Sequence, residues 1–348
     1  MRVPTIFTAE KIAQTLAERY GISDVSGATE LAGSSTGHVW KVETGSGSTY
    51  ILKEFTSTFP LERVAHEPEL VVHLHKKGLP VSQYYPTVSG ELTWVLEGCP
   101  VNLQSFLTGT PAQQCQASPK LLEDSVKLLA DIQLAMADYP ALAFSMDEDW
   151  FVYRKDTVRR QKKLGDLLGL AQALEHDNQY KDQIVSDLEW KLSSLEKAHQ
   201  MEFDPTRFTY GNTHGDYNVG NLLVNGEEIV GAIDFSNARQ LPFVSEVLRS
   251  YTLGAPECAE AVIDLENLRQ YFGWYQERLS LNEYDLTMAA KLSYFHIVNT
   301  GFGYHEYLVE GAENVGSLIG YSSWNVKLAK WYEAHEEEIA EALGSVAR

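Results

Sequence analysis

The feature that most constrains the fold of this chain is a short hairpin signal inside an otherwise helix-rich C-terminal half. Two runs of β-forming residues, 221–224 and 229–235, are joined through Asn225-Gly226, the dipeptide that most strongly predicts a tight turn. A polar loop at residues 213–221 precedes the first run, and Asp234 lies near the end of the second. Because a hairpin returns the chain to the edge where it began, we expect these polar residues to lie on one side of it.

Three side chains at this hairpin have the types and the order that phosphoryl transfer requires. Asp216 can accept a hydrogen bond, and then a proton, from an attacking hydroxyl group, and we predict that it is the catalytic base. Asn221 and Asp234 offer oxygen ligands of the kind that Mg²⁺ prefers when it bridges nucleotide phosphates. Since Asp216 takes the role of base, His214 is expected to order the loop through hydrogen bonds. The alternative is that these polar residues only cap turns around the hairpin.

The N-terminal part of the chain predicts an antiparallel sheet that could contact a nucleotide. Residues 38–43 and 49–55 are strand-like runs separated by a Gly- and Ser-rich turn, which is typical of a hairpin. Lys53 lies at the end of the second run, where its ammonium group could neutralise nucleotide phosphates. Glu67 lies on the helix predicted to follow and could hold that lysine in place. Further strands are expected at residues 91–96 and 101–106.

Two neighbouring segments complete the predicted nucleotide site. The small-residue turn at residues 31–37 would let backbone N–H groups approach a phosphate, and it contains Gly33, Ser34 and Ser35. The helix that carries Glu67 is expected to span residues 60–77, and Pro68 is expected to kink or split it.

The remaining patterns indicate two lobes. Residues 8–21 predict an amphipathic helix with Thr8 as its N-cap and Gly21 as its stop. Residues 108–120 are rich in Thr, Pro, Gln, Ser and Gly, which is typical of a linker, and we place the boundary there. From residue 120 onward, apart from the hairpin, the patterns are helical.

Taken together, these motifs resemble the aminoglycoside phosphotransferase and choline kinase-like superfamily. Its signature is HGDxxxxN followed by IDF or IDW, and this chain has HGDYNVGN and AIDF. The resemblance extends to ILKEF, to the helix that ends in GLPV, and to PTVSGELTWVL followed by LQSFLTG. The pattern is nearest to the homoserine kinase-like and sugar kinase-like members, which implies that Phe106 and Leu107 lie beside the adenine.

The resemblance implies a protein-kinase-like α+β fold with two lobes. A nucleotide-binding N-lobe, with an antiparallel sheet and helices, would span residues 1–107. A largely helical C-lobe, with the small catalytic β-hairpin and the acceptor site, would span residues 108–348. The implied reaction moves the γ-phosphate of ATP or GTP, with Mg²⁺, to a hydroxyl group of a small polar molecule: an amino alcohol, a sugar, an amino sugar or an aminoglycoside. The chain departs from the usual pattern at Tyr217-Asn218, where many members have a hydrophobic residue and His.

Charge narrows the range of partners. The chain has 28 basic and 48 acidic residues, a formal net charge of −20, which repels nucleic acids and anionic membranes. We therefore expect a small hydroxylated acceptor that is neutral or cationic, and neither a nucleic acid nor a membrane as a partner. Three widely spaced cysteines predict neither a disulfide framework nor a zinc site, which favours a cytoplasmic location. No pattern indicates the oligomeric state.

Several other interpretations stay open from the sequence. A Ser/Thr protein kinase of the same fold, or a nucleotide-binding pseudokinase or scaffold, would share most of the motifs, although pseudokinases typically lose a residue that this chain retains. Residues 33–37 also match the GxSxG motif of serine hydrolases, but that motif must link a strand to a helix. The basic run at residues 154–163 is either an ordinary charged helix face or an anion-binding surface. Aromatic residues at 271–275 and 294–307 either form the core of the C-lobe or line a sugar pocket.

Overall fold

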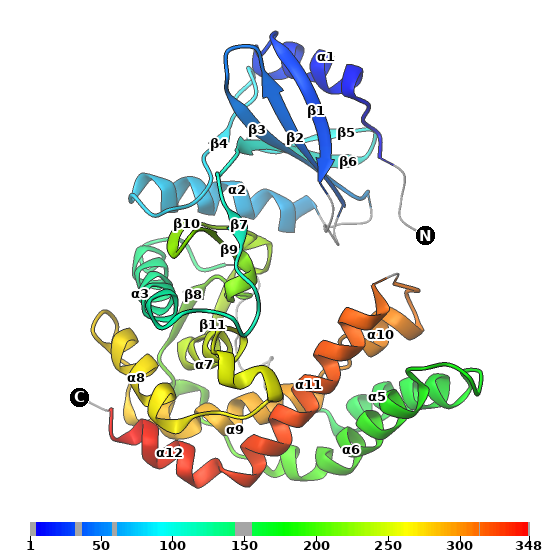
Figure 1. The fold of residues 1–348 in the computed structure, drawn as a ribbon, viewed down its shortest axis with the longest axis vertical. Helices are drawn as coiled ribbons and strands as arrows, with labels where there is room; N and C mark the ends of the chain where they lie inside the picture. The colour runs from blue at the N-terminus through cyan, green and yellow to red at the C-terminus, as the bar shows by residue number, and fades with distance from the viewer. Residues whose placement is uncertain (1–4, 32–36, 58–60, 143–154, 313, 347–348) are drawn as a thin grey trace.

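The computed structural model describes residues 5–31, 37–57, 61–142, 155–312 and 314–346, and its N-lobe is built around the predicted hairpin (Figure 1). Strands β2 (Gly37–Thr44) and β3 (Thr49–Phe55) pair antiparallel, with Lys53 opposite Val39. The full sheet is antiparallel, with the order β1-β2-β3-β6-β4 and with β5 on β6. The remaining strands are β1 (Val25–Leu31), β4 (Tyr84–Tyr85), β5 (Trp94–Leu96) and β6 (Cys99–Ser105).

Helix α1 (Ala9–Tyr20) confirms the capping predicted for it. The Thr8 side chain accepts a hydrogen bond from the backbone of Lys11, and Gly21 ends the helix in the left-handed conformation. Its apolar residues Ile12 and Leu16 are fully buried in the core cluster that includes the inner face of the sheet.

Helix α2 (Leu61–Lys76) is one continuous helix that contains Pro68, so the proline does not split it, and the alternative of a kink stays a prediction. Leu70, Val71 and Leu74, which follow the proline, are buried in the same hydrophobic cluster as the C-lobe helices. This packing outweighs the backbone hydrogen bond that a proline removes. In Figure 1, α2 accordingly lies between the sheet and the C-lobe.

The segment at residues 108–120, whose composition is typical of a linker, is bound to the C-lobe. Its short strand β7 (Thr110–Pro111) pairs with the C-lobe hairpin at residues 222–232, and the backbone of Cys115 and Ala117 donates hydrogen bonds to the carbonyls of Leu253 and Gly254. Composition alone does not reveal such docking, because backbone groups of any residue type can make these bonds. The boundary between residues 107 and 108 stays a prediction.

The C-lobe is largely helical, and most of its aromatic residues form the core. Tyr271, Phe272, Tyr294, Phe295 and Tyr304 are all nearly or fully buried. Among the described residues, no helix has the length and apolar character needed to cross a membrane. The helices of this lobe are α3 (Pro119–Ala135), α5 (Thr157–Gln172), α6 (Lys181–Gln200), α7 (Phe243–Gly254), α8 (Leu265–Gln276), α9 (Glu283–Asn299), α10 (Tyr304–Leu308), α11 (Val315–Ala334) and α12 (Glu336–Gly344).

Candidate active site

The predicted hairpin is present and brings its two ends together. Strands β9 (Leu222–Asn225) and β10 (Glu228–Ala232) pair antiparallel, and Gly226 occupies the turn with a φ of 64°. At the open end, the N–H group of Ile233 donates to the carbonyl of Asn221 (3.0 Å). This bond places Asn221 and Asp234 next to each other on adjoining segments, as the sequence predicts.

Asp216 is bound to the same end of the hairpin. The Asn221 Nδ2 group donates to the Asp216 carbonyl (2.9 Å) and lies 3.4 Å from its carboxylate Oδ2. About a third of the Asp216 side chain is exposed, so the carboxylate can reach a molecule that enters from solvent. The structure therefore brings together the residues that were predicted as base and metal ligands.

His214 orders this loop, in agreement with its predicted role. Its Nδ1 atom accepts a hydrogen bond from the Asp216 backbone (3.3 Å), so its Nε2–H group is the one that donates to the Ile233 carbonyl (3.0 Å). Both ring nitrogens are thus hydrogen-bonded to backbone groups, one on each side of the site. Gly215 beside it has a φ of 79°, and a Cβ atom there would lie 1.9 Å from the Asn237 carbonyl oxygen.

Lys53 lies between two carboxylates. Its Nζ atom is 3.2 Å from Glu67 Oε1, and Glu67 is almost fully buried on α2. Burial alone would lower the pKa of Lys53, but Glu67 and Asp234 outweigh it and raise that pKa, so the ammonium form is retained. Burial likewise works to raise the pKa of Asp234, but Lys53 and the Ser236 hydroxyl lower it below its usual range. Asp234 is therefore held as a carboxylate, in a left-handed backbone conformation with φ 65°.

The predicted adenine-side residues lie where the sheet leads to the hairpin. The Phe106 backbone donates to the Thr49 carbonyl (3.2 Å), and Leu107 packs so closely on β10 that a Cβ atom at Gly231 would lie 2.3 Å from its Cδ1. The Lys41 ammonium is 5.3 Å from the centre of the Phe106 ring. Gly33, Ser34 and Ser35 lie outside the described residues.

Two charged residues of α7 contact the predicted site residues and were not predicted from the sequence. Arg249 Nη2 is 2.7 Å from Asp216 Oδ1, and Arg249 also donates to the Tyr217 carbonyl (3.3 Å). Glu246 is buried; its carboxylate accepts hydrogen bonds from the Tyr217 backbone (3.0 Å) and from the Thr213 hydroxyl. The available signal was a glutamate and an arginine in a helix that has no other charged residue, since buried charges are rare unless they are paired.

Tyr217 shows how this chain accommodates its departure from the usual loop pattern. Its ring is fully buried, and its hydroxyl group donates to the Ser125 carbonyl on α3 (2.6 Å). Together with the bond to Glu246, this contact fixes the catalytic loop against the C-lobe core.

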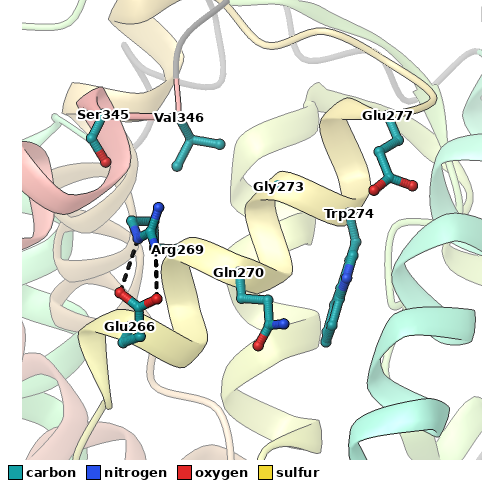
Figure 2. Close-up of a pocket in the computed structure, with 8 residues that line it drawn as sticks. All are labelled: Glu266, Arg269, Gln270, Gly273, Trp274, Glu277, Ser345 and Val346. Carbon is teal, nitrogen blue, oxygen red and sulfur yellow. Dashed lines mark hydrogen bonds and ion pairs between the residues drawn. The ribbon is translucent and has the colours of Figure 1, made fainter.

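A hollow of about 470 Å³ on helix α8 is separate from this site (Figure 2). It is lined by residues of α8 and the C-terminal segment, and none of the predicted site residues contributes to it. Its arginine, Arg269, is already paired with Glu266 (2.5 Å), as the dashed lines in the figure show. The hollow is therefore not the candidate active site that the predicted residues form at the hairpin.

The basic run in α5 also lies apart from the predicted set of site residues. Lys162 is largely exposed and pairs with Asp166 one turn later (2.7 Å), whereas Arg160 is buried. For the described part of the run, this mixture of exposed and buried charges fits an ordinary helix surface better than a uniform anion-binding face.

Comparisons with known proteins agree with this geometry. The profile of the phosphotransferase enzyme family matches residues 27–280. A homoserine kinase from Methylobacillus glycogenes is 23% identical over 236 residues, which are 68% of this chain and 65% of that enzyme. The match thus spans slightly less than two thirds of this relative's length.

Solved structures show the same fold. An aminoglycoside phosphotransferase from Alicyclobacillus acidocaldarius is 14% identical with a TM-score of 0.64, and the match covers 98% of both chains. A spectinomycin phosphotransferase, in complex with ADP and spectinomycin, is 15% identical with a TM-score of 0.61, covering 97% of this chain and 99% of that one. The predicted protein-kinase-like α+β fold is confirmed.

Proposed function

The chain belongs to the phosphotransferase enzyme family, and from this premise we propose that it transfers the γ-phosphate of ATP or GTP to a hydroxyl group of a small molecule. The observation that carries the proposal is the joining of Asp216 and Asn221 to Asp234 at the open end of one hairpin. Lys53, held by Glu67 of the N-lobe at 3.2 Å, interacts electrostatically with Asp234, which raises the pKa of the lysine.

We assign the roles from this geometry. Asp216 accepts the proton of the acceptor hydroxyl as the oxygen attacks phosphorus, and Arg249 holds the Asp216 carboxylate in place. Lys53, held by Glu67, neutralises charge on the phosphates. The family resemblance, and not this geometry, is the basis for proposing that Phe106 and Leu107 contact the adenine and that Gly33, Ser34 and Ser35 contact the phosphates.

The hairpin residues fit a magnesium ion. Asn221 and Asp234 supply hard oxygen ligands, and Lys53 keeps Asp234 ionised, which a cation ligand requires. When bound, Mg²⁺ would offset the negative charge that the transferring phosphoryl group carries.

Charge and location complete the proposal. With a net charge of −20 and the phosphates already in the cleft, a neutral or cationic acceptor is favoured over an anionic one. The three cysteines are free thiols, which supports a location in the reducing cytoplasm.

The proposal is tested by nucleotide consumption with purified protein and a panel of hydroxylated metabolites and aminoglycosides. Transfer to at least one acceptor is expected, and Asp216→Asn should lower turnover about 10²-fold or more while nucleotide binding persists in calorimetry. Asp138→Asn, which removes an exposed carboxylate paired with Lys77, is the matched control and should keep full turnover. Near-normal turnover of Asp216→Asn would remove that residue from the role of base.

A further inference from the structure

Phe302 differs from its aromatic neighbours in the C-lobe. It is 46% exposed, whereas Phe295 and Tyr304 are fully buried. Its loop is nevertheless firmly held: the Ser322 hydroxyl donates to the Phe302 carbonyl (2.8 Å), and a Cβ atom at Gly303 would lie 1.9 Å from that hydroxyl oxygen. The fold therefore fixes an apolar ring that it does not bury.

Phe302 is the first of three aromatic side chains in a row, and the other two lie on α11. Its ring meets Tyr321 edge-on, with the centroids 5.9 Å apart, and Tyr321 stacks on Trp324 at 6.0 Å. The Trp324 Nε1–H group donates to the Cys258 carbonyl (2.7 Å), which fixes the indole. We call Phe302, Tyr321 and Trp324 the aromatic wall.

The aromatic wall reaches the catalytic base through one side chain. Tyr321 lies near enough to Arg249 for the two side chains to interact electrostatically, and Arg249 is the residue paired with Asp216 at 2.7 Å. Arg249 and Asp216 are both about one-third exposed at this point. Figure 1 shows α10 and the first turns of α11 rising from the C-lobe in the direction of the N-lobe. A molecule whose hydroxyl group meets Asp216 can therefore extend along the wall.

The charges around the aromatic wall select the kind of molecule. Arg249 lies at one end, and near the other end the Lys163 Cε atom would be 3.7 Å from a Cβ atom at Gly301. The carboxylate of Glu306, in the first turn of α10, already accepts a hydrogen bond from the Gly303 N–H group (2.5 Å). Aromatic rings can bind ammonium groups, but Lys163 near one end of the wall opposes that use, and at the other end the charge of Arg249 is balanced by Asp216.

We propose, on the basis of the function proposed above, that the aromatic wall binds the acceptor and that the acceptor is a neutral hydroxylated ring, such as a sugar or a cyclitol. The C–H face of such a ring packs on aromatic side chains, while a hydroxyl group at its edge meets Asp216. A short linear amino alcohol has no ring face to pack on Phe302, so the aromatic wall would add little to its binding.

The first measurement is binding without chemistry. Calorimetry of the wild-type protein with Mg²⁺ and a non-hydrolysable ATP analogue is carried out with hexoses and cyclitols, with glycerol and homoserine, and with choline. At least one ring compound should bind at least about 10-fold more tightly than every linear compound and choline. Tighter binding of choline would show an ammonium site, and equal binding of linear and ring compounds would likewise overturn the inference.

The second measurement uses a pair of variants at one position. Phe302→Leu keeps an apolar side chain but removes the ring, and it should raise KM for the preferred ring acceptor by about 2- to 10-fold with kcat nearly unchanged. Phe302→Tyr should restore KM, and Leu170→Ala, at a similarly exposed apolar residue of α5, should leave it unchanged. KM for linear acceptors should not change in any variant.

These results separate this inference from the proposed function. If transfer occurs but Phe302→Leu changes KM equally for ring and linear acceptors, or for neither, the aromatic wall is not the acceptor site and the phosphotransferase proposal stands. If no acceptor is phosphorylated and Asp216→Asn changes no activity, the phosphotransferase proposal itself fails, and this inference fails with it.

Discussion

Lys53 depends on two carboxylates that reach it from different parts of the chain. Glu67 comes from α2 in the N-lobe, and Asp234 comes from the end of the catalytic hairpin. Burial without these partners would favour the neutral amine, because a low-dielectric environment disfavours charge. The charge state of this lysine is therefore set jointly by the N-lobe and the hairpin.

Replacement of Lys53 is expected to affect both binding and turnover. Lys53→Ala removes the cation that faces the phosphates, so nucleotide affinity should fall and turnover should fall by about 10-fold or more. Calorimetry with Mg²⁺ and nucleotide, together with steady-state kinetics, measures the two effects.

The control for Lys53 has to be a lysine far from the nucleotide. Lys120→Ala is suitable because Lys120 is exposed and its ion-pair partner, Asp124 (2.6 Å), lies one turn later on the same helix. Lys41, which strand alternation alone suggests as a control, is unsuitable, because its ammonium lies over the Phe106 ring. Equal effects of Lys53→Ala and Lys120→Ala would contradict the role of Lys53.

At the level of elements, the catalytic loop relies on a close approach between two backbone segments. Gly215 has a positive φ, and its Cα faces the Asn237 carbonyl so closely that no side chain fits. The loop and the segment after Asp234 are thus packed together through a glycine, as well as through the hydrogen bonds of His214.

Substitution of Gly215 should lower the free energy of unfolding far more than substitution of Gly226 in the hairpin turn. Gly226→Ala also introduces a side chain at positive φ, but nothing lies within 4 Å, so only the backbone cost of about 1 kcal/mol is expected. Gly215→Ala adds a clash with the backbone, so the free energy of unfolding of this variant should fall by at least about 2 kcal/mol more than that of Gly226→Ala. Urea denaturation of the two variants measures this difference, and equal losses would contradict the packing described here.

For the whole molecule, a buried lysine links the C-lobe helices and makes stability depend on pH. Lys191 on α6 donates hydrogen bonds to the carbonyls of Ile297 and Thr300, at the end of α9. Burial lowers its pKa to about 7, although Asp187, one turn earlier, opposes that shift. The folded protein therefore releases this proton far more readily than the unfolded chain, in which lysine has its ordinary pKa.

The sign of the effect follows from proton counting. Between about pH 7 and the ordinary lysine pKa, the unfolded chain holds one more proton, so the free energy of unfolding rises with pH, by up to about 1.4 kcal/mol per unit. Below pH 7 both states are protonated and the contribution is constant.

A comparison of variants isolates this contribution from all other titrating groups. Lys191→Met should remove the slope, so the difference in unfolding free energy between the wild type and the variant should change with pH from 7 to 9. Lys197→Met, at a half-exposed lysine of the same helix, should leave the slope unchanged. A wild-type slope that persists in Lys191→Met would contradict the assignment.

The hairpin, the capped first helix and the strands around Lys53 were predictable from sequence because their signals are local. A turn dipeptide, a cap residue and the alternation of apolar side chains act over a few residues, and tertiary packing agrees with them here. The order of Asp216, Asn221 and Asp234 was likewise readable, because one short hairpin determines their separation.

The pairing of Arg249 with Asp216, the docking of residues 108–120 and the exposure of Phe302 could not be predicted in this way. Each depends on which distant segment packs against the residue, and no local pattern encodes that choice. Phe295 and Phe302 show the difference, since both belong to one aromatic run, yet one is buried and the other is half-exposed beside α11. The hydrophobic effect favours burial of both rings, and only the packing of helices around them leaves one in contact with solvent.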